Sequence, residues 1–248
     1  MPGACRMTTV DTGARPVEEI RFGGARAFGV ELFTPGEVAE VAAAVAAVPA
    51  GLRHGAREVP SLSTIGEAFY LNRERPGYYA ACARAENRLL YRHFRLVHER
   101  VAVFFEQRYG MPVVYAEDLA VPGFHLFEFP EPGEYPGGGW HVDSLETQVP
   151  SLVARRAAIT AVVNFTVPFV LPDGGSGLDL EADVPGAPPG RRGGGEPVTV
   201  PYRAGTMVFT ETELWHRISG SRCRKPGQRR VTHQGHGVRL GDRWLFFW

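Results

Sequence analysis

In the first half of the chain, hydrophobic residues recur at every third or fourth position, which is the period of an α-helix. Residues 37–48 (EVAEVAAAVAAV) follow this period, and Thr34 with Glu37 has the pattern of a capping box, so we expect a capped helix that ends near Pro49. The same period from Pro76 to about Tyr109 predicts a second helical region, which the following Gly-Met-Pro ends. Because this region exceeds the length of a typical globular helix, a break inside it is left open.

From residue 112 onward the pattern changes to short runs of β-branched and aromatic residues that are separated by glycine and proline. Such runs in succession, with no helical pattern between them, indicate a β-sandwich or jelly roll rather than a parallel α/β sheet. The predicted fold class is therefore α+β, with a jelly-roll core and a helical N-terminal layer. The runs cover residues 113–121, 124–130, 158–171, 176–184, 197–202, 205–211 and 231–240.

The length of 248 residues suits one large domain with a full hydrophobic core. Residues 1–20 follow neither pattern, and we expect a disordered tail there, followed by a single domain over 21–248. Within that domain, 21–111 is the predicted helical support region and 112–248 the jelly-roll core. The Gly-, Pro- and Arg-rich residues 183–197 predict a flexible connection rather than a binding patch.

Composition excludes several classes of function. Lys plus Arg and Asp plus Glu number 27 each, so no overall field directs the chain toward nucleic acid or an anionic membrane. No apolar run approaches the roughly 20 residues that span a bilayer, and no secretory signal is present, so a cytoplasmic location is expected. The cysteines Cys5, Cys82 and Cys223 are few and far apart, which argues against a disulfide framework or a thiolate zinc site. The predicted partner is a small molecule.

The candidate chemistry begins in the stretch GGGWHVDSLE, where His141 and Asp143 stand two residues apart. Composition alone predicts roughly one such His-x-acid pair, so the pair needs further support. On a strand, residues two apart share one face, and both side chains can then reach one ion. Two histidines and one carboxylate form the facial triad that holds Fe(II) and leaves three positions open. His216, which follows the run 205–211, is the predicted third ligand.

Two later histidines are rivals for the third position. His233 and His236 lie three apart, so on a strand they face opposite ways. If His233 were the ligand, the arginine ten residues on would be Arg243, and the residue two further is Leu245 instead of a serine or threonine. No ligand role is predicted for the remaining histidines: His54 lies in a loop, and His93 and His98 are expected on the solvated side of the long helix.

The order of these features resembles the Fe(II)/2-oxoglutarate-dependent dioxygenase superfamily. The chain has His-x-Asp, a Gly-x-x-x-Phe strand at 205–209 that leads to His216, and an Arg-x-Thr pair at Arg230 and Thr232. The Gly-turn and strand at 173–180 are also similar to that family. The resemblance, which covers residues 112–248, implies a double-stranded β-helix (jelly-roll, cupin-like) core. It also implies Fe(II), 2-oxoglutarate and O2, with Arg230 and Thr232 holding the distal carboxylate; Arg229 is the alternative anchor.

The resemblance also implies a reaction. Halogenases of the superfamily have Gly or Ala in place of the carboxylate ligand, so the presence of Asp143 indicates hydroxylation, with desaturation or cyclisation left open. The chain is loosely similar to free-amino-acid hydroxylases and halogenases of natural-product pathways. In that case Arg73 or Arg75 would hold the substrate carboxylate, Glu128 would meet an amine, and His125 would line the pocket. Two alternatives remain: a cupin-like dioxygenase or isomerase that does not use 2-oxoglutarate, and a non-catalytic binding module.

Overall fold

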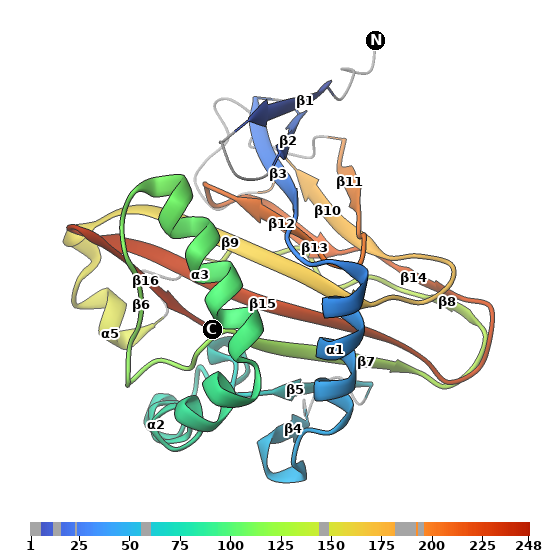
Figure 1. Cartoon of the computed structure of the whole chain (residues 1–248), viewed down its shortest axis with the longest axis horizontal. Helices are drawn as coiled ribbons and strands as arrows, with labels where there is room; N and C mark the ends of the chain where they lie inside the picture. The colour runs from blue at the N-terminus through green and yellow to red at the C-terminus, as the bar shows by residue number, and fades with distance from the viewer. Residues whose placement is uncertain are drawn as a thin grey trace.

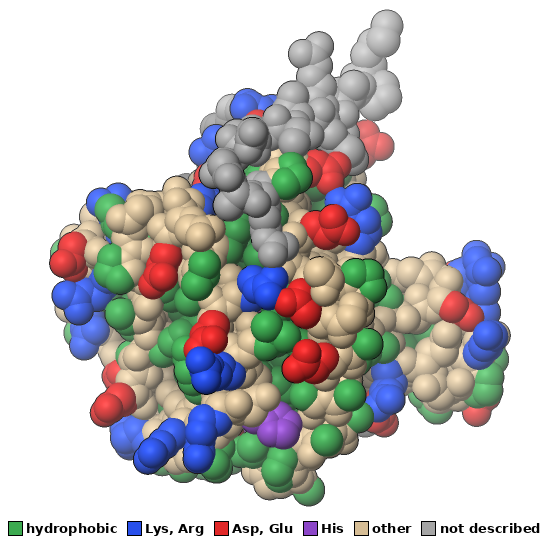
Figure 2. All heavy atoms as spheres, viewed as in Figure 1, with side chains coloured by type: hydrophobic (Ala, Val, Ile, Leu, Met, Phe, Trp, Pro, Cys, Tyr) green, Lys and Arg blue, Asp and Glu red, His purple; other side chains and the backbone are tan. Residues whose placement is uncertain are grey.

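A computed structural model of the chain describes residues 6–11, 16–22, 24–55, 61–143, 149–181, 192 and 196–248, and all structural statements concern these residues. Strands form a large antiparallel sheet, and shorter strands form two small sheets (Figure 1). The predicted α+β jelly roll is confirmed. No described helix combines the length and the apolar character needed to cross a bilayer. Acidic and basic side chains are intermixed over the face in Figure 2, in keeping with their equal numbers.

The large sheet has 11 strands and carries most of the fold. Its long central strands β9 and β15 pair along most of their length, with β7 on the other side of β15. The order along the sheet is β1 (Arg6–Asp11), β2 (Pro16–Phe22), β3 (Ala25–Glu31), β12 (Thr206–Thr210), β9 (Ile159–Val170), β15 (Gln228–Leu240), β7 (Gly123–Phe129), β5 (Leu62–Ile65) and β4 (Arg53–Gly55). At β15 the sheet branches to β16 (Arg243–Phe247) and then β6 (Val113–Tyr115).

The small sheets complete the jelly roll. One has the order β11 (Val198–Pro201), β10 (Gly177–Glu181) and β13 (Trp215–Ile218). The other pairs β14 (Ser221–Cys223) with β8 (Gly133–Tyr135), and it forms the arm that projects to the right in Figure 1. The structure thus places strands in every predicted run, although the run 113–121 forms only the three residues of β6. The end of the run 176–184 and most of the loop 183–197 lie outside the described residues.

The N-terminal predictions need two corrections. Residues 6–11 and 16–22 form the antiparallel pair β1–β2, which continues the large sheet through β3, so the disordered tail predicted over 1–20 is wrong for these residues. The region 21–111 is also not purely helical, because β3, β4 and β5 lie within it. Val17 and Phe28 are buried in the main core, which explains why this hairpin is ordered.

The helices agree with the hydrophobic pattern. Helix α1 (Pro35–Ala46) has the predicted capping box, in which the Thr34 hydroxyl accepts from the Glu37 amide and the Glu37 carboxylate accepts from the Thr34 amide. The long region divides at Phe94 into α2 (Pro76–His93) and α3 (Arg95–Tyr109), and Gly110 ends α3 with a left-handed φ of 65°. The short helices are α5 (Pro150–Val153), η1 (Ala50–Leu52), η2 (Phe69–Leu71) and η3 (Arg156–Ala158).

The two faces of strand β15 have different surroundings: one packs in the hydrophobic core and the other faces a cavity. Val231 and His233 are buried on the face toward α3, within a core of aromatic and aliphatic side chains from the helices and the sheet. Arg230, Gln234 and His236 line a cavity on the other face. This alternation follows from the two-residue period of a strand. One strand therefore anchors the helical layer and supplies the cavity with polar groups.

Candidate metal centre

Backbone pairing between two distant segments brings the first two candidate ligands together. His141 and His216 form an antiparallel bridge, with His141 N–H donating to His216 O at 3.0 Å and His216 N–H donating to His141 O at 2.9 Å. Directly opposed residues project their side chains on the same face. The preceding glycines permit this approach, because a Cβ on Gly137 would lie 2.4 Å from the Ile218 carbonyl oxygen on β13.

Each imidazole is held with one nitrogen directed into the centre. The Nδ1 of His141 lies 2.8 Å from Gly139 O, and the Nδ1 of His216 lies 2.9 Å from Leu214 O. A carbonyl oxygen only accepts, so Nδ1 carries a proton in both rings, and Nε2 of each ring offers a lone pair to a metal when it is deprotonated. Burial lowers the pKa of His216, but the adjacent Asp143 carboxylate outweighs it and raises this pKa above its usual value. This arrangement of a backbone acceptor behind each ring is typical of metal-binding histidines.

Asp143 faces both rings. Its oxygens lie 3.9 Å from His141 Nε2 and 3.2 Å from His216 Nε2. Burial raises the pKa of Asp143, but the electrostatic interaction with the adjacent His216 and His236 imidazoles and the hydrogen bond with His216 outweigh it and hold the pKa of this carboxyl below its usual range. Candidate ligand atoms of His141, Asp143 and His216 all lie within 4.8 Å of one another. One carboxylate oxygen and two imidazole nitrogens suit Fe(II) and related divalent metals, so the donor set fits the predicted ion.

The 2-oxoglutarate anchor predicted at Arg230 is deeply buried. Its side chain is 4% exposed, and its Nη1 donates to Ser176 Oγ at 2.9 Å and to Ser221 Oγ at 3.1 Å. No described carboxylate pairs with it, its Nε has no hydrogen-bond partner, and burial lowers the pKa of Arg230 to about 10. An unpaired guanidinium in such a place is costly unless an anion joins it, so the residue fits a bound carboxylate.

Arg229 and Thr232, which flank Arg230 on β15, differ in burial and in the face of the strand on which they lie. Arg229 is exposed, as expected from its position on the other face of β15, and it does not line the cavity. Thr232 shares the face of Arg230 and is fully buried, but it lies outside the cavity lining, and its Oγ1 is 3.5 Å from Gln234 Nε2. The geometry thus favours Arg230 over Arg229 and brings Thr232 near the cavity rather than into it.

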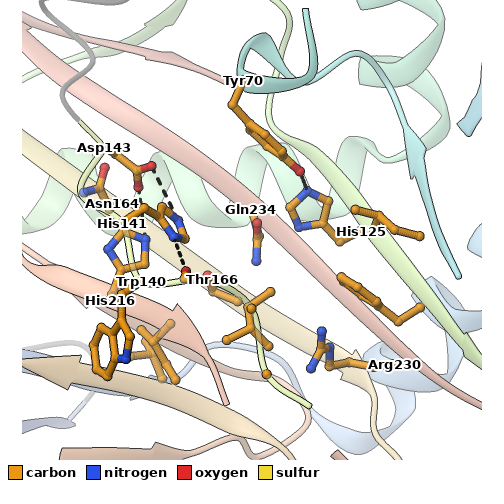
Figure 3. A pocket seen from close by; sticks show the side chains of 18 of the residues that line it. Tyr70, His125, Trp140, His141, Asp143, Asn164, Thr166, His216, Arg230 and Gln234 are labelled. Carbon is orange, nitrogen blue, oxygen red and sulfur yellow. Dashed lines mark hydrogen bonds and ion pairs between the residues drawn. The ribbon is translucent and has the colours of Figure 1, made fainter. Parts of the chain in front are cut away.

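A cavity of about 710 Å³ connects the metal candidates with Arg230. In Figure 3, Asp143, His141 and His216 lie on one side, Tyr70 and His125 lie on the other, and Gln234 lies between them. His125 is 5% exposed, and its Nε2 receives the Tyr70 hydroxyl in a short hydrogen bond. Burial lowers the pKa of His125 to about 3, so this imidazole is neutral and acts as an acceptor. The prediction that His125 lines the pocket agrees with this placement.

Of the other residues predicted to bind the substrate, one lines the cavity and two do not. Arg73 lines the cavity from the turn after η2. Arg75 does not line the cavity, and the Arg75 guanidinium donates to Asn72 Oδ1 at 2.8 Å. Glu128 is exposed on the face of β7 opposite to His125, and it does not line the cavity. The role predicted for Glu128 as partner of a substrate amine is therefore wrong on position, because the two-residue period turns it away.

The rival histidines are also resolved. His233 is fully buried in the core, 5.5 Å between ring centroids from His98. His98, which we expected on a solvated surface, is 1% exposed and stacks on Tyr91, and burial lowers its pKa to about 3. His236 does reach the cavity, but its Nδ1 is 2.8 Å from Asn164 Oδ1 and 3.8 Å from the Asp143 carboxylate. It lies beside the candidate ligands, not among them.

Several cavity residues had no signal in the sequence. Tyr70 and Asn164 are polar residues in segments predicted only as loop or strand, and whether their side chains face the cavity depends on tertiary packing. Trp248 reaches the cavity because β16 returns the end of the chain beside β7. A Cβ on Gly123 would lie 2.1 Å from its indole ring, so only glycine fits there. The glycine that precedes the alternating aromatic residues of β7 was the sequence feature that could have indicated this close approach of another group.

Comparisons with known proteins agree at the level of fold. No family model and no curated protein matches the sequence. Among solved structures, an N-substituted L-amino acid dioxygenase from Burkholderia ambifaria AMMD, in complex with alpha-KG, has a TM-score of 0.56 and 11% identity over 98% of this chain and 100% of that chain. A second structure of that dioxygenase has a TM-score of 0.52 and 11% identity, over 94% of this chain and 98% of that chain. The predicted fold of the Fe(II)/2-oxoglutarate-dependent dioxygenase superfamily is therefore the fold of this chain.

Proposed function

We propose that the chain is an Fe(II)/2-oxoglutarate-dependent oxygenase that hydroxylates an unactivated C–H bond of a small, amino-acid-like substrate. One observation carries the proposal: the triad of candidate ligands and a buried guanidinium without a carboxylate partner face the same cavity. A metal site alone would leave the cupin-like alternative open. The buried Arg230 gives 2-oxoglutarate a specific binding group, which that alternative does not require.

Each residue has a distinct task in this proposal. His141, Asp143 and His216 would hold Fe(II), and Arg230 would bind the far carboxylate of 2-oxoglutarate while Ser176 and Ser221 fix its guanidinium. Fe(II) with 2-oxoglutarate and O2 supplies the oxidising power for attack on a C–H bond. The apolar cavity walls exclude water from that reaction, and Thr232 is proposed to support the arginine from the adjacent position of β15. The protein thus contributes binding, orientation and a dry site.

Asp143 supports hydroxylation as the outcome. A carboxylate in the ligand set occupies the position that a halide would need, so the wild-type chain should give hydroxylated product even in high chloride. The amino-acid-like substrate is supported by Arg73 at the cavity and by the structural similarity to an N-substituted L-amino acid dioxygenase. Chlorinated product from the wild-type chain would contradict the role of Asp143 as an iron ligand.

The proposal is tested with purified chain loaded anaerobically with Fe(II). We expect one Fe(II) per chain and a visible absorption band when 2-oxoglutarate is added. In air, a substrate screen of free and N-substituted amino acids should reveal succinate formation that depends on the substrate. Iron binding without any response to 2-oxoglutarate would favour the cupin-like alternative, and no iron binding would favour a binding module.

A further inference from the structure

The charges along the cavity are unequal. Two arginines, Arg73 and Arg230, are among the described residues that line it, and Asp143 is the only carboxylate among them. Arg230 is buried and Arg73 is exposed, and the remaining lining is largely apolar, where an unpaired charge of a bound substrate is poorly tolerated. The cavity therefore discriminates between substrates by the sign of their charge.

Asp143 is not available to a substrate ammonium. Its carboxylate lies 3.2 Å from His216 Nε2 and 3.8 Å from His236 Nδ1, and the proposed function assigns it to the metal. Glu128, the carboxylate expected to meet an amine, lies outside the cavity. A free ammonium group in the described cavity would therefore lack a carboxylate partner and would lie in a space that also contains two guanidinium groups.

Arg73 is placed to meet an anion. It makes no ion pair with any described residue, and its turn is held by Asn72, whose amide donates to Glu67 Oε2 at 2.6 Å and to Ala68 O at 3.1 Å. Arg75, two residues on, is engaged by Asn72 and by the ring of Tyr78. Arg73 is an exposed residue that lines the cavity from a fixed turn, and its planar guanidinium is able to pair with a carboxylate that enters there.

The walls require a substrate with a large apolar body. The volume of about 710 Å³ lies in the upper part of the range of ~300–1,000 Å³ that holds drug-sized ligands, and 2-oxoglutarate fills a minor part of it. Aromatic and aliphatic side chains from all three sheets surround the remaining space, and a free polar amino acid would leave these walls uncovered. The apolar lining includes Phe127, Phe129, Tyr135, Trp140, Leu178 and Trp248.

We infer that the substrate is an organic acid with a bulky apolar or aromatic body, whose nitrogen, where it has one, is uncharged, and that Arg73 binds its carboxylate. This inference rests on the proposed function for the reaction, and it narrows the substrate class. Free amino acids and primary amines are disfavoured, whereas N-acylated amino acids and aryl-substituted carboxylic acids fit.

The test measures binding, without iron, of matched probes by isothermal titration calorimetry. Each set contains an acid, its zwitterion and its amine: N-acetyl-L-phenylalanine, L-phenylalanine and phenethylamine, and the corresponding tryptophan compounds. We expect the N-acetyl acids to bind at least tenfold more tightly than their zwitterions and amines. If no acid binds more tightly than its matched zwitterion and amine, the inference is wrong.

Variants locate the site of the acid. Arg73→Ala should weaken binding of the N-acetyl acids at least fivefold, and Arg73→Lys should recover part of it, whereas the control Arg75→Ala should leave it unchanged. Acid preference that survives Arg73→Ala but is lost in Arg230→Ala would assign the probe to the 2-oxoglutarate anchor and overturn the role of Arg73. Because no iron is present, acid preference without any iron or 2-oxoglutarate binding would refute the proposed function alone. Iron and 2-oxoglutarate binding without acid preference would refute this inference alone.

Discussion

Two clusters of histidine and carboxylate in this molecule have similar composition and opposite geometry. In the candidate metal centre, His141 and His216 keep their Nδ1 on backbone carbonyls and direct Nε2 toward Asp143 and the cavity. In the second cluster, His54 on β4 lies between Glu67 and Glu86, with Nδ1 at 3.0 Å from one carboxylate and Nε2 at 3.1 Å from the other. Both nitrogens of His54 can donate at once only when the ring is protonated.

The difference teaches how to distinguish a metal site from a structural cluster. The two carboxylates raise the pKa of His54 to about 9 through their hydrogen bonds, which leaves no lone pair for a metal at neutral pH. Glu67 is further satisfied by Asn72 and by the Tyr78 hydroxyl at 3.1 Å. This closed cluster fixes the turn that carries Tyr70 and Arg73 to the cavity. In the open cluster, candidate ligand atoms of two histidines and one carboxylate lie within 4.8 Å of one another and face a cavity, and that convergence marks the candidate binding site.

The largest expected effect is loss of the metal from the open cluster. Asp143→Ala and His216→Ala should each lower Fe(II) affinity by roughly a thousandfold or more, because even groups behind a ligand change affinity by about 10–100-fold. The measurement is iron per chain after anaerobic loading and desalting. His54→Ala and His93→Ala are the matched histidine controls and should retain one iron. Full iron in the His216 variant would instead favour His236 as the ligand.

The next effect concerns the buried guanidinium. Arg230→Ala removes a charged hydrogen-bond partner from a dry site, so 2-oxoglutarate affinity should fall by about 1.5–4 kcal/mol, or roughly tenfold to a thousandfold. Titration of the visible band in the Fe(II) protein gives the dissociation constant. Arg229→Ala, which removes an exposed side chain on the other face of β15, should behave as the wild type. Equal losses in the two variants would remove the structural reason for choosing Arg230.

A smaller effect is expected at the closed cluster, on stability instead of binding. Because the pKa of His54 in the folded chain is raised from its ordinary value of 6.5 to about 9, the contribution of His54 to stability is complete below about pH 6.5 and is lost as pH rises through 9. The free energy of unfolding in urea should therefore fall by on the order of 2 kcal/mol between pH 6.5 and 9.5. His54→Ala should be less stable at pH 6.5 and should lose this slope. A wild-type slope that persists in His54→Ala would assign it to another group.

The smallest effect is expected at Glu128. Its side chain is exposed on the face of β7 away from the cavity, so Glu128→Gln should change stability and the binding of every probe acid or amine by less than about 0.5 kcal/mol. Calorimetry with phenethylamine is the sensitive measurement, since an amine would lose most if this carboxylate were its partner. A clear loss of amine binding would restore the predicted role of Glu128 and contradict its position.

Local patterns in the sequence predicted the elements that depend on neighbouring residues. The capping box at Thr34, the glycine after Tyr109 and the succession of short strands gave the helices and the jelly roll. The hairpin β1–β2 was missed because the buried hydrophobic residues of β2, Val17, Ile20 and Phe22, do not keep a two-residue period, and β2 is placed by its pairing with β3 and by the core. His98 was misplaced because its burial depends on packing of α3 against Tyr115 and His233, which are distant in sequence.

The sequence by itself determined that Arg230 and Thr232 share a strand face, because a two-residue spacing on a strand is a local property of the backbone. The strand expected at His141 and Asp143 is not formed, since His141 makes only an isolated bridge and Asp143 lies outside any strand. Only the tertiary structure decided that His216, and not His233 or His236, stands opposite His141. It also decided that Arg73 reaches the cavity while Glu128 turns away. These choices depend on cross-strand register and on the phase of each strand relative to the core. Contacts between residues far apart in the chain determine both the register and the phase, and these contacts cannot be inferred from a local sequence pattern.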